Sequence, residues 1–219
     1  TAFDHNINTG NSYAEKSQSA NASDLAFNYK YGDRLDQKLY VRLNNSYRFA
    51  NIDEYWAMGY DAANGWAPYR IFSGILKPQK TSTAEIGGDW NLSSSAKLSA
   101  SVYQMDSKNE IRYDNDSGDN INSPDIRRTG INVYAQLTPV SNLTISPKVN
   151  IQSAKYTAGI YDGKQVAMVP DATIGLGLRY QQSSNLTFLG NVSYTSTQFY
   201  EGDQNNSLNK MPSSTILDL

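Results

Sequence analysis

The segment Leu143-Thr144-Ile145-Ser146-Pro147-Lys148-Val149-Asn150-Ile151-Gln152 decides the fold class. Apolar residues at 143, 145, 149 and 151 oppose polar residues at 144, 146, 148, 150 and 152. Successive side chains of a strand point to opposite faces, so this alternation predicts a strand with one apolar and one polar face. The segment also has the length of a tilted membrane-spanning strand, which needs about 9 to 11 residues.

The same alternation recurs along most of the chain, at residues 25–31, 39–44, 84–90, 97–102, 131–137, 173–180 and 186–194. With the terminal residues 215–219, it predicts roughly nine strands of an all-β protein. The strand faces are expected to differ in environment. We expect one set of side chains to point outward to lipid, namely Leu98, Val102, Ile131, Val133, Ile145, Ile174, Leu176 and Phe188. We expect a second set to point inward, namely Glu85, Lys97, Asn132, Lys148 and Arg179.

The connections between the expected strands alternate in length. Short turns are expected at residues 32–36, 93–95, 139–142 and 182–185, and long connections at 50–79, 114–125, 157–169 and 201–211. Short turns at one end and long loops at the other are typical of an antiparallel transmembrane β-barrel, with periplasmic turns and extracellular loops. The long loops should therefore all lie at one end of the sheet.

Composition excludes several other classes of protein. Hydrophobic residues make up 39% of the chain and no apolar run approaches the roughly 20 residues of a membrane helix, so contact with a bilayer would require strands. A net charge of −2 gives no basic surface for nucleic acid. Cysteine is absent, which excludes disulfides and thiolate metal sites. The 16 tyrosines suit a membrane interface, although tyrosine also favours strands.

No catalytic residue, metal site or cofactor is predicted. The single histidine, His5, has no acidic or nucleophilic neighbour in a motif. Asp114, Asp116, Asp119 and Asp125 superficially resemble a calcium loop, but Gly118 precedes the position at which such a loop needs glycine. We therefore interpret this acidic run as a solvated loop and the protein as a non-enzyme.

Five short motifs follow one another along the chain: SYRFANIDE at residues 46–54, LKPQKTSTAEIG at 76–87, YQMDSKNEI at 103–111, RRTGI at 127–131 and VPDA at 169–172. They resemble, in the same order, motifs of the TonB-dependent receptors. Gln79 stands where that family more often has Glu, Asn132 replaces a usual Glu, and the last motif lacks the family's His.

The resemblance implies a barrel of about 22 strands with an N-terminal plug inside it. Residues 1–219 would then be part of the barrel domain, roughly strands 12 to 20, with the plug, the first strands and the last strands outside this sequence. It also implies a receptor in the outer membrane of a Gram-negative bacterium, in contact with outer-membrane lipid. Such a receptor takes up a scarce nutrient, such as a ferric siderophore or a cobalamin-like chelate, with energy relayed through the plug by TonB and its inner-membrane complex.

The first long connection concentrates the candidate ligand-contact residues: Tyr55, Trp56, Tyr60, Trp66, Tyr69 and Arg70. Aromatic faces and a guanidinium suit metal chelates or flat cofactors, because they stack and pair with anionic groups. Alternatively, these residues belong to an interfacial aromatic girdle or pack the loop on itself.

Two other functions remain open from the residues alone. One is a passive outer-membrane porin or structural barrel without energised uptake. The other is a soluble, secreted β-sandwich that binds carbohydrate, because the polar face of such a sandwich also tolerates Lys, Arg and Asn.

Overall fold

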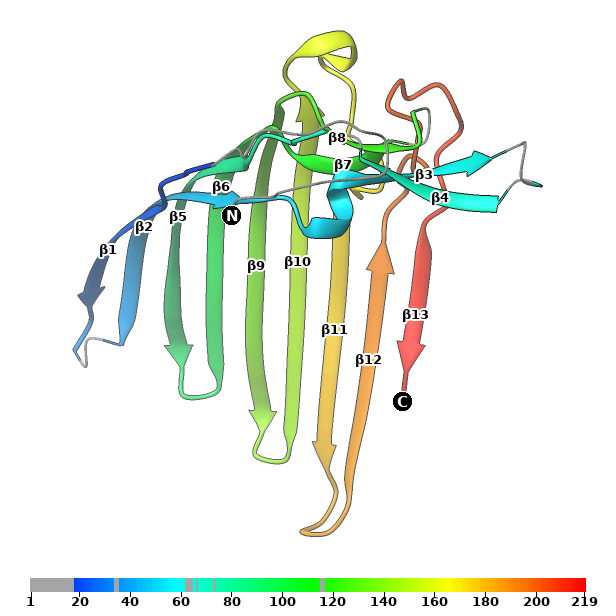
Figure 1. Cartoon of the computed structure of the whole chain (residues 1–219). Coiled ribbons are helices and arrows are strands. Elements are labelled where there is room, and N and C mark those ends of the chain that lie inside the picture. Colours follow the sequence, from blue (N-terminus) through cyan, green and yellow to red (C-terminus); the bar gives the residue numbers. More distant parts are fainter. Residues whose placement is uncertain (1–17, 34–35, 62–64, 66, 73, 115–116) are drawn as a thin grey trace.

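The main body of the protein is a single nine-stranded antiparallel sheet (Figure 1). The computed structural model describes residues 18–33, 36–61, 65, 67–72, 74–114 and 117–219. In spatial order, the strands are β1 (Ser23–Tyr31), β2 (Gln37–Arg48), β5 (Gln79–Ser93), β6 (Ala96–Lys108), β9 (Ile126–Val140), β10 (Leu143–Tyr156), β11 (Ala172–Gln181), β12 (Thr187–Thr195) and β13 (Ser214–Asp218). The all-β class and the nine strands expected from the alternation are confirmed. The sheet is open, with β1 and β13 at its edges, as part of a larger barrel would be.

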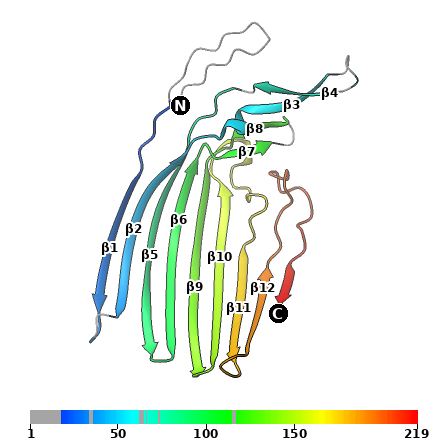
Figure 2. The same cartoon turned by 60° about the horizontal axis from the view of Figure 1, so that its bottom comes forward.

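Connections of different length lie at opposite ends of the sheet. Figures 1 and 2 show the turns β1–β2, β5–β6, β9–β10 and β11–β12 at one end and every long connection at the other. We call these the short-turn end and the long-connection end. The expected segregation of turns and loops is confirmed.

Two of the expected loops contain additional strands. The connection at residues 50–79 forms a 3-10 helix, η1 (Ile52–Tyr55), and a hairpin of β3 (Trp56–Asp61) and β4 (Ala67–Phe72). The next connection forms a second hairpin of β7 (Ile111–Asp114) and β8 (Asp119–Asn122). A shorter 3-10 helix, η3 (Gly159–Tyr161), lies in the third connection. Among the described residues, no helix is long and apolar enough to span a bilayer.

The register divides the sheet into two chemically different faces. Directly paired residues share a face, and the row Val41, Ile86, Val102, Ile131 and Ile151 is apolar, whereas the neighbouring row Tyr40, Gly87, Ser101, Asn132 and Asn150 is not. Side chains on the apolar face stay exposed, with 46% of Val102 and 47% of Ile131 accessible. All the outward and inward side chains named from the sequence lie on the expected faces.

Aromatic side chains gather on the apolar face at the short-turn end. The rings of Tyr29 and Tyr31 stack with centroids 5.9 Å apart, and the Trp90 indole N–H donates to the Tyr31 hydroxyl at 3.0 Å. Across the sheet, Tyr180 and Phe188 stack at 6.4 Å. An apolar ring with a polar edge suits a membrane–water interface, so this end of the sheet carries an aromatic girdle.

Candidate functional site

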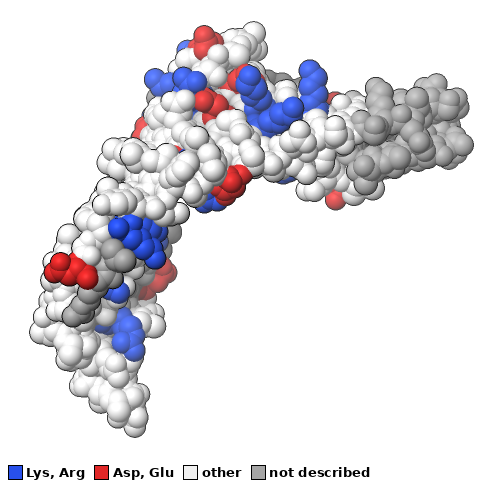
Figure 3. Space-filling model, turned by 90° about the vertical axis from the view of Figure 1, so that its left-hand side faces the viewer, with Lys and Arg blue, Asp and Glu red and all other residues white. Residues whose placement is uncertain are grey.

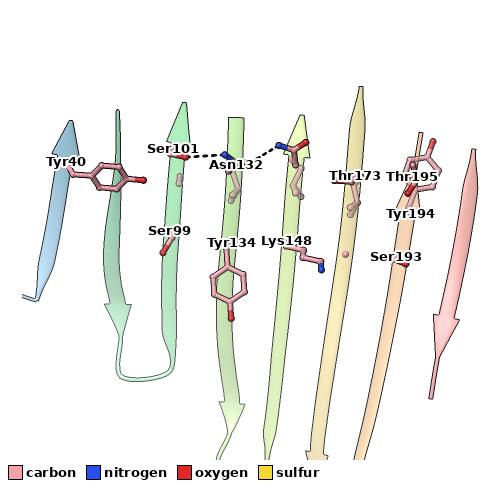
Figure 4. A pocket seen from close by; sticks show the side chains of 16 residues that line it. Tyr40, Ser99, Ser101, Asn132, Tyr134, Lys148, Thr173, Ser193, Tyr194 and Thr195 are labelled. Atoms are coloured by element: carbon pink, nitrogen blue, oxygen red, sulfur yellow. Dashed lines mark hydrogen bonds between the residues drawn. The ribbon is translucent and has the colours of Figure 1, made fainter. Parts of the chain in front are cut away.

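The polar face forms a hollow of about 470 Å³ near its centre (Figure 4). Tyr40, Tyr134 and Lys148 line it, together with a row of short polar side chains. Within that row, the Asn150 amide donates to Asn132 at 2.7 Å, and the Asn132 amide donates to the Ser101 hydroxyl at 3.5 Å. The polar side chains that line the hollow are therefore hydrogen-bonded to one another across neighbouring strands, and water can contact them.

Charge is distributed unevenly over the polar face. On the β1, β2 and β5 side, Lys38 pairs with Asp89 at 2.5 Å, Arg42 pairs with Asp24, and the Tyr40 hydroxyl donates to Glu85 at 3.1 Å. On β10 and β11, by contrast, Lys148 and Arg179 form no ion pair within the described part of the chain. The wall is thus neutralised on one side and basic on the other, which suits contact with polar or anionic groups.

Two arginines at the ends of barrel strands hold the long connections over the polar face. Arg48 of β2 contacts both carboxylate oxygens of Glu54 at 3.0 and 2.7 Å, and it also donates to the Ile111 carbonyl at 3.3 Å. Arg128 of β9 contacts both oxygens of Glu110, at 3.0 and 3.1 Å. In the Arg128 pair two guanidinium nitrogens meet two carboxylate oxygens, a bidentate geometry that fixes orientation as well as distance. In the Arg48 pair one nitrogen contacts both oxygens of Glu54. The first two hairpins are therefore tied to strand ends.

Glu54 links the Arg48 clamp to η1. Its carboxylate also accepts a hydrogen bond from the Asn51 backbone N–H at 2.7 Å, which completes a capping box. Burial raises the pKa of Glu54, but the hydrogen bonds from Arg48 and Asn51 outweigh it and hold this pKa below its usual 4.5. Glu54 is thus kept in the charged form that the clamp requires.

The long connections also bind one another. Asn122 of β8 bridges to the first connection, because its side chain accepts from the Lys77 N–H at 2.7 Å and donates to the Lys77 carbonyl at 2.9 Å. The third connection joins the second where the Thr157 N–H donates to the Asp125 carbonyl at 2.8 Å. It joins the fourth through Gln165 and Asn206, whose reciprocal bonds measure 2.7 and 3.0 Å. The connections form one hydrogen-bonded network.

The candidate ligand-contact residues belong to the first of these connections. Tyr55 lies in η1, is only 6% exposed, and packs on Phe72 with ring centroids 6.5 Å apart. Trp56 begins β3 and meets Phe72 edge to face at 5.8 Å. Backbone pairs of the hairpin join Tyr60 to Pro68, Gly59 to Tyr69 and Met58 to Arg70, whereas Trp66 lies outside the described residues.

The hairpin therefore brings the backbone of most of these residues together. Sequence reasoning missed the roles of Phe72, Arg48 and Arg128. The sequence did contain a signal for the role of Arg48, because the motif SYRFANIDE places it six residues before the oppositely charged Glu54.

Comparison with known proteins places this architecture in a family. The sequence model of the family described as "TonB dependent receptor-like, beta-barrel" matches residues 1–219. The chain belongs to the TonB-dependent receptor β-barrel family. No curated protein sequence matches it.

Solved structures of TonB-dependent receptor barrels share the fold at low sequence identity. The chain resembles the ferric yersiniabactin uptake receptor FyuA from Yersinia pestis with a TM-score of 0.70 and 17% identity, over 96% of this chain and 31% of FyuA. For the siderophore receptor PiuA from Acinetobacter baumannii, the values are 0.71 and 17%, over 97% and 31%. For the ferric preacinetobactin receptor BauA from Acinetobacter baumannii, they are 0.67 and 19%, over 95% and 30%. The chain thus spans about a third of the length of these structures.

Proposed function

We propose that the complete protein is an outer-membrane receptor that takes up a scarce nutrient, such as a ferric siderophore or a cobalamin-like chelate, with energy relayed by TonB. The observation that carries the proposal is the match of the TonB-dependent receptor barrel family to the whole chain. FyuA, PiuA and BauA are named as receptors for siderophores or their ferric complexes, which favours this nutrient class. In this proposal TonB and its inner-membrane complex act through a plug, and outer-membrane lipid surrounds the barrel.

The two faces of the sheet support this role. The apolar face exposes Val102, Ile131 and Ile174, as a lipid-facing wall does. The polar face carries the hollow with Tyr134 and Lys148, as a wet lumen requires. A single sheet with these two faces argues against the carbohydrate-binding β-sandwich, because no second sheet is stacked on the apolar face in the described part of the chain.

Ligand contact is assigned in this proposal to the first long connection. Trp56, Tyr60, Trp66, Tyr69 and Arg70 would supply stacking faces and a cation for an anionic chelate. Tyr55 would contribute by supporting the hairpin, since its ring is buried against Phe72. The tether from Arg48 to Glu54 holds the base of the same hairpin at the rim of the barrel.

Energised uptake can be tested with the full-length protein in its outer membrane. Cells expressing it are given a panel of radio-iron siderophores and labelled cobalamin, and accumulation is measured before and after collapse of the proton gradient. We expect at least one nutrient of this class to accumulate, and the gradient's collapse or deletion of TonB to stop its accumulation while surface binding persists. Accumulation that is indifferent to both treatments would instead support the passive porin.

A further inference from the structure

Four basic side chains lie on the apolar face, all at the long-connection end. They are Lys80 of β5, Lys108 of β6, Arg127 of β9 and Lys155 of β10, and all four are exposed. Because these strands are neighbours in the sheet, we call the four residues the outer cation row. Figure 3 shows Lys and Arg side chains both at the upper end of the molecule and along its lower arm, whose lowest part is largely uncharged.

The register of the outer cation row sets like charges side by side. Lys80 is directly opposite Lys108, and Arg127 is directly opposite Lys155. Like charges in directly opposite positions of antiparallel strands repel and destabilise the pair. A bound anion would offset this repulsion in each of the two pairs.

Protein acids offset only part of this charge. Asp106 pairs with Arg127 at 2.6 Å, and its charge also interacts with that of Lys108. Asp125, the residue before β9, makes no ion pair with any described residue, and neither do Lys80, Lys108 and Lys155. The row therefore keeps an excess of positive charge that is open to solvent.

The row lies where the sheet leaves its apolar band. Each step of two residues along a strand covers about 6.6 to 6.8 Å. One step beyond the apolar row, the same face carries Leu43, Ala84, Gln104, Thr129 and Ser153. The next step reaches Asn45, Ser82, Asp106, Arg127 and Lys155. Lys80 and Lys108 lie one step further, so all four cations follow the apolar surface toward the long-connection end.

The opposite rim has a different chemistry. At the short-turn end, the apolar face carries the aromatic girdle around Trp90 and Phe188. The described cations nearest that end, Lys30, Lys97 and Arg179, lie on the polar face instead. Among the described residues of the sheet, cations on the apolar face therefore lie at the long-connection rim.

We propose that the outer cation row binds the phosphate groups of anionic lipid headgroups in the leaflet on the long-connection side. A phosphate oxygen accepts strong hydrogen bonds from ammonium and guanidinium donors, and one phosphate between opposed cations cancels their repulsion. The acyl chains of the same lipid would cover Val102 and Ile131, which a free phosphate would not. The proposal rests on the proposed function only in placing the barrel in a bilayer.

Lipid binding can be measured on the purified full-length receptor in neutral detergent, by native mass spectrometry. The probes are phosphatidic acid, diacylglycerol with the same acyl chains, and inorganic phosphate. The test variant combines Lys80→Gln, Lys108→Gln and Lys155→Gln, which leaves the Arg127–Asp106 pair intact. The matched control combines Lys30→Gln, Lys97→Gln and Arg179→Gln on the polar face. A rescue variant combines Lys80→Arg, Lys108→Arg and Lys155→Arg.

We expect the wild-type receptor to prefer phosphatidic acid to both other probes. The test variant should lose affinity on the order of tenfold or more, whereas the control and rescue variants should not, since each cation near an anionic surface adds about 1 kcal/mol. Lys108→Gln alone should lose about fivefold on the same basis and serves if the triple variant fails to assemble. Unchanged affinity in the test variant, equal losses in test and control, or equal binding of diacylglycerol or inorganic phosphate would overturn the proposal. None of these readouts depends on nutrient uptake.

Discussion

Tyr103 of β6 lies against Gly130 of β9, its direct partner in the register, so closely that a β-carbon on Gly130 would stand 2.7 Å from the Tyr103 hydroxyl oxygen. The same β-carbon would stand 2.8 Å from the backbone carbonyl oxygen of Ile151. The tyrosine ring can rotate away, but the carbonyl belongs to the next strand. From that place the Tyr103 hydroxyl donates to Gln152 at 3.3 Å, so the glycine permits a link across three strands.

Gly130→Ala should therefore destabilise the barrel. We expect a loss of about 1 to 3 kcal/mol in the free energy of unfolding, because the new methyl group forces a shift of backbone. Urea unfolding of the full-length protein in lipid vesicles measures it. Gly177→Ala is the matched control, since its β-carbon would find only Ser146, at 3.6 Å, and it should be tolerated. Equal effects of the two substitutions would contradict the steric explanation.

Adjacent positions in the middle of β9 should respond oppositely to a charge. Val133 is on the apolar face and Asn132 on the polar face. Near the midplane of the bilayer, Val133→Arg should cost on the order of 2 to 4 kcal/mol, whereas Asn132→Arg enters a wet wall and should cost much less. Unfolding in vesicles and the yield in the outer membrane report the difference. Equal tolerance of Arg at both positions would argue against a bilayer around this sheet.

The aromatic hairpin should be needed for binding but not for assembly. Replacing Trp56, Trp66 and Arg70 together by Ala in the full-length receptor should weaken nutrient binding at least tenfold while the protein still reaches the membrane. Strand pairing and the lipid-facing surface, rather than this loop, stabilise a barrel. Binding of the radio-iron siderophore to whole cells is the measurement, and Tyr113→Ala, an exposed aromatic of β7, is the control. Unchanged binding would show that these residues only pack the loop. Loss of expression would show that they are needed for folding.

Acid should release the Arg48 clamp through Glu54. A carboxyl whose pKa is lowered in the folded state stabilises it above the unfolded value and loses that contribution as the pH falls through the folded pKa. We therefore expect hydrogen-exchange protection of the Asn51 amide to persist at neutral pH and to fall below pH 4.5. The effect should be about 1 kcal/mol or less, because 39% of the Arg48 side chain is exposed.

Two variants test the assignment to Glu54. Glu54→Gln should remove the acid transition at Asn51. Arg48→Met should move it to higher pH, because burial still raises the pKa of Glu54 once the cation is gone. A transition that stays in place in both variants would show that another group titrates.

The alternation in the sequence predicted the sheet well because one face of each strand meets an apolar environment and the other face meets water. Alternation at Leu98, Ala100 and Val102 reproduced the middle of β6, and the short turns fell where expected. Strand ends were underestimated for a physical reason. β9 begins at Ile126 rather than at residue 131, because Arg127 and Thr129 on its outer face lie beyond the apolar band and carry no alternation.

The two hairpins of the long connections, β3–β4 and β7–β8, were harder to predict. The strand β3 contains Trp56-Ala57-Met58-Gly59-Tyr60-Asp61, in which apolar residues do not alternate, and β7 and β8 have only four residues each. The second hairpin is also held by a contact distant in sequence, the bond from Arg48 to the Ile111 carbonyl. Composition identified an aromatic segment, but it could not show that Tyr55 is buried against Phe72.

Arg48 restricts the movement of the first two long connections relative to each other. One guanidinium, fixed at the end of β2, is bonded both to Glu54 of the first connection and to Ile111 of the second. Moving the first connection would break the bond to Glu54, and moving the second would break the bond to the Ile111 carbonyl. A surface ordered in advance loses less conformational freedom on binding, and more of each contact then appears as affinity.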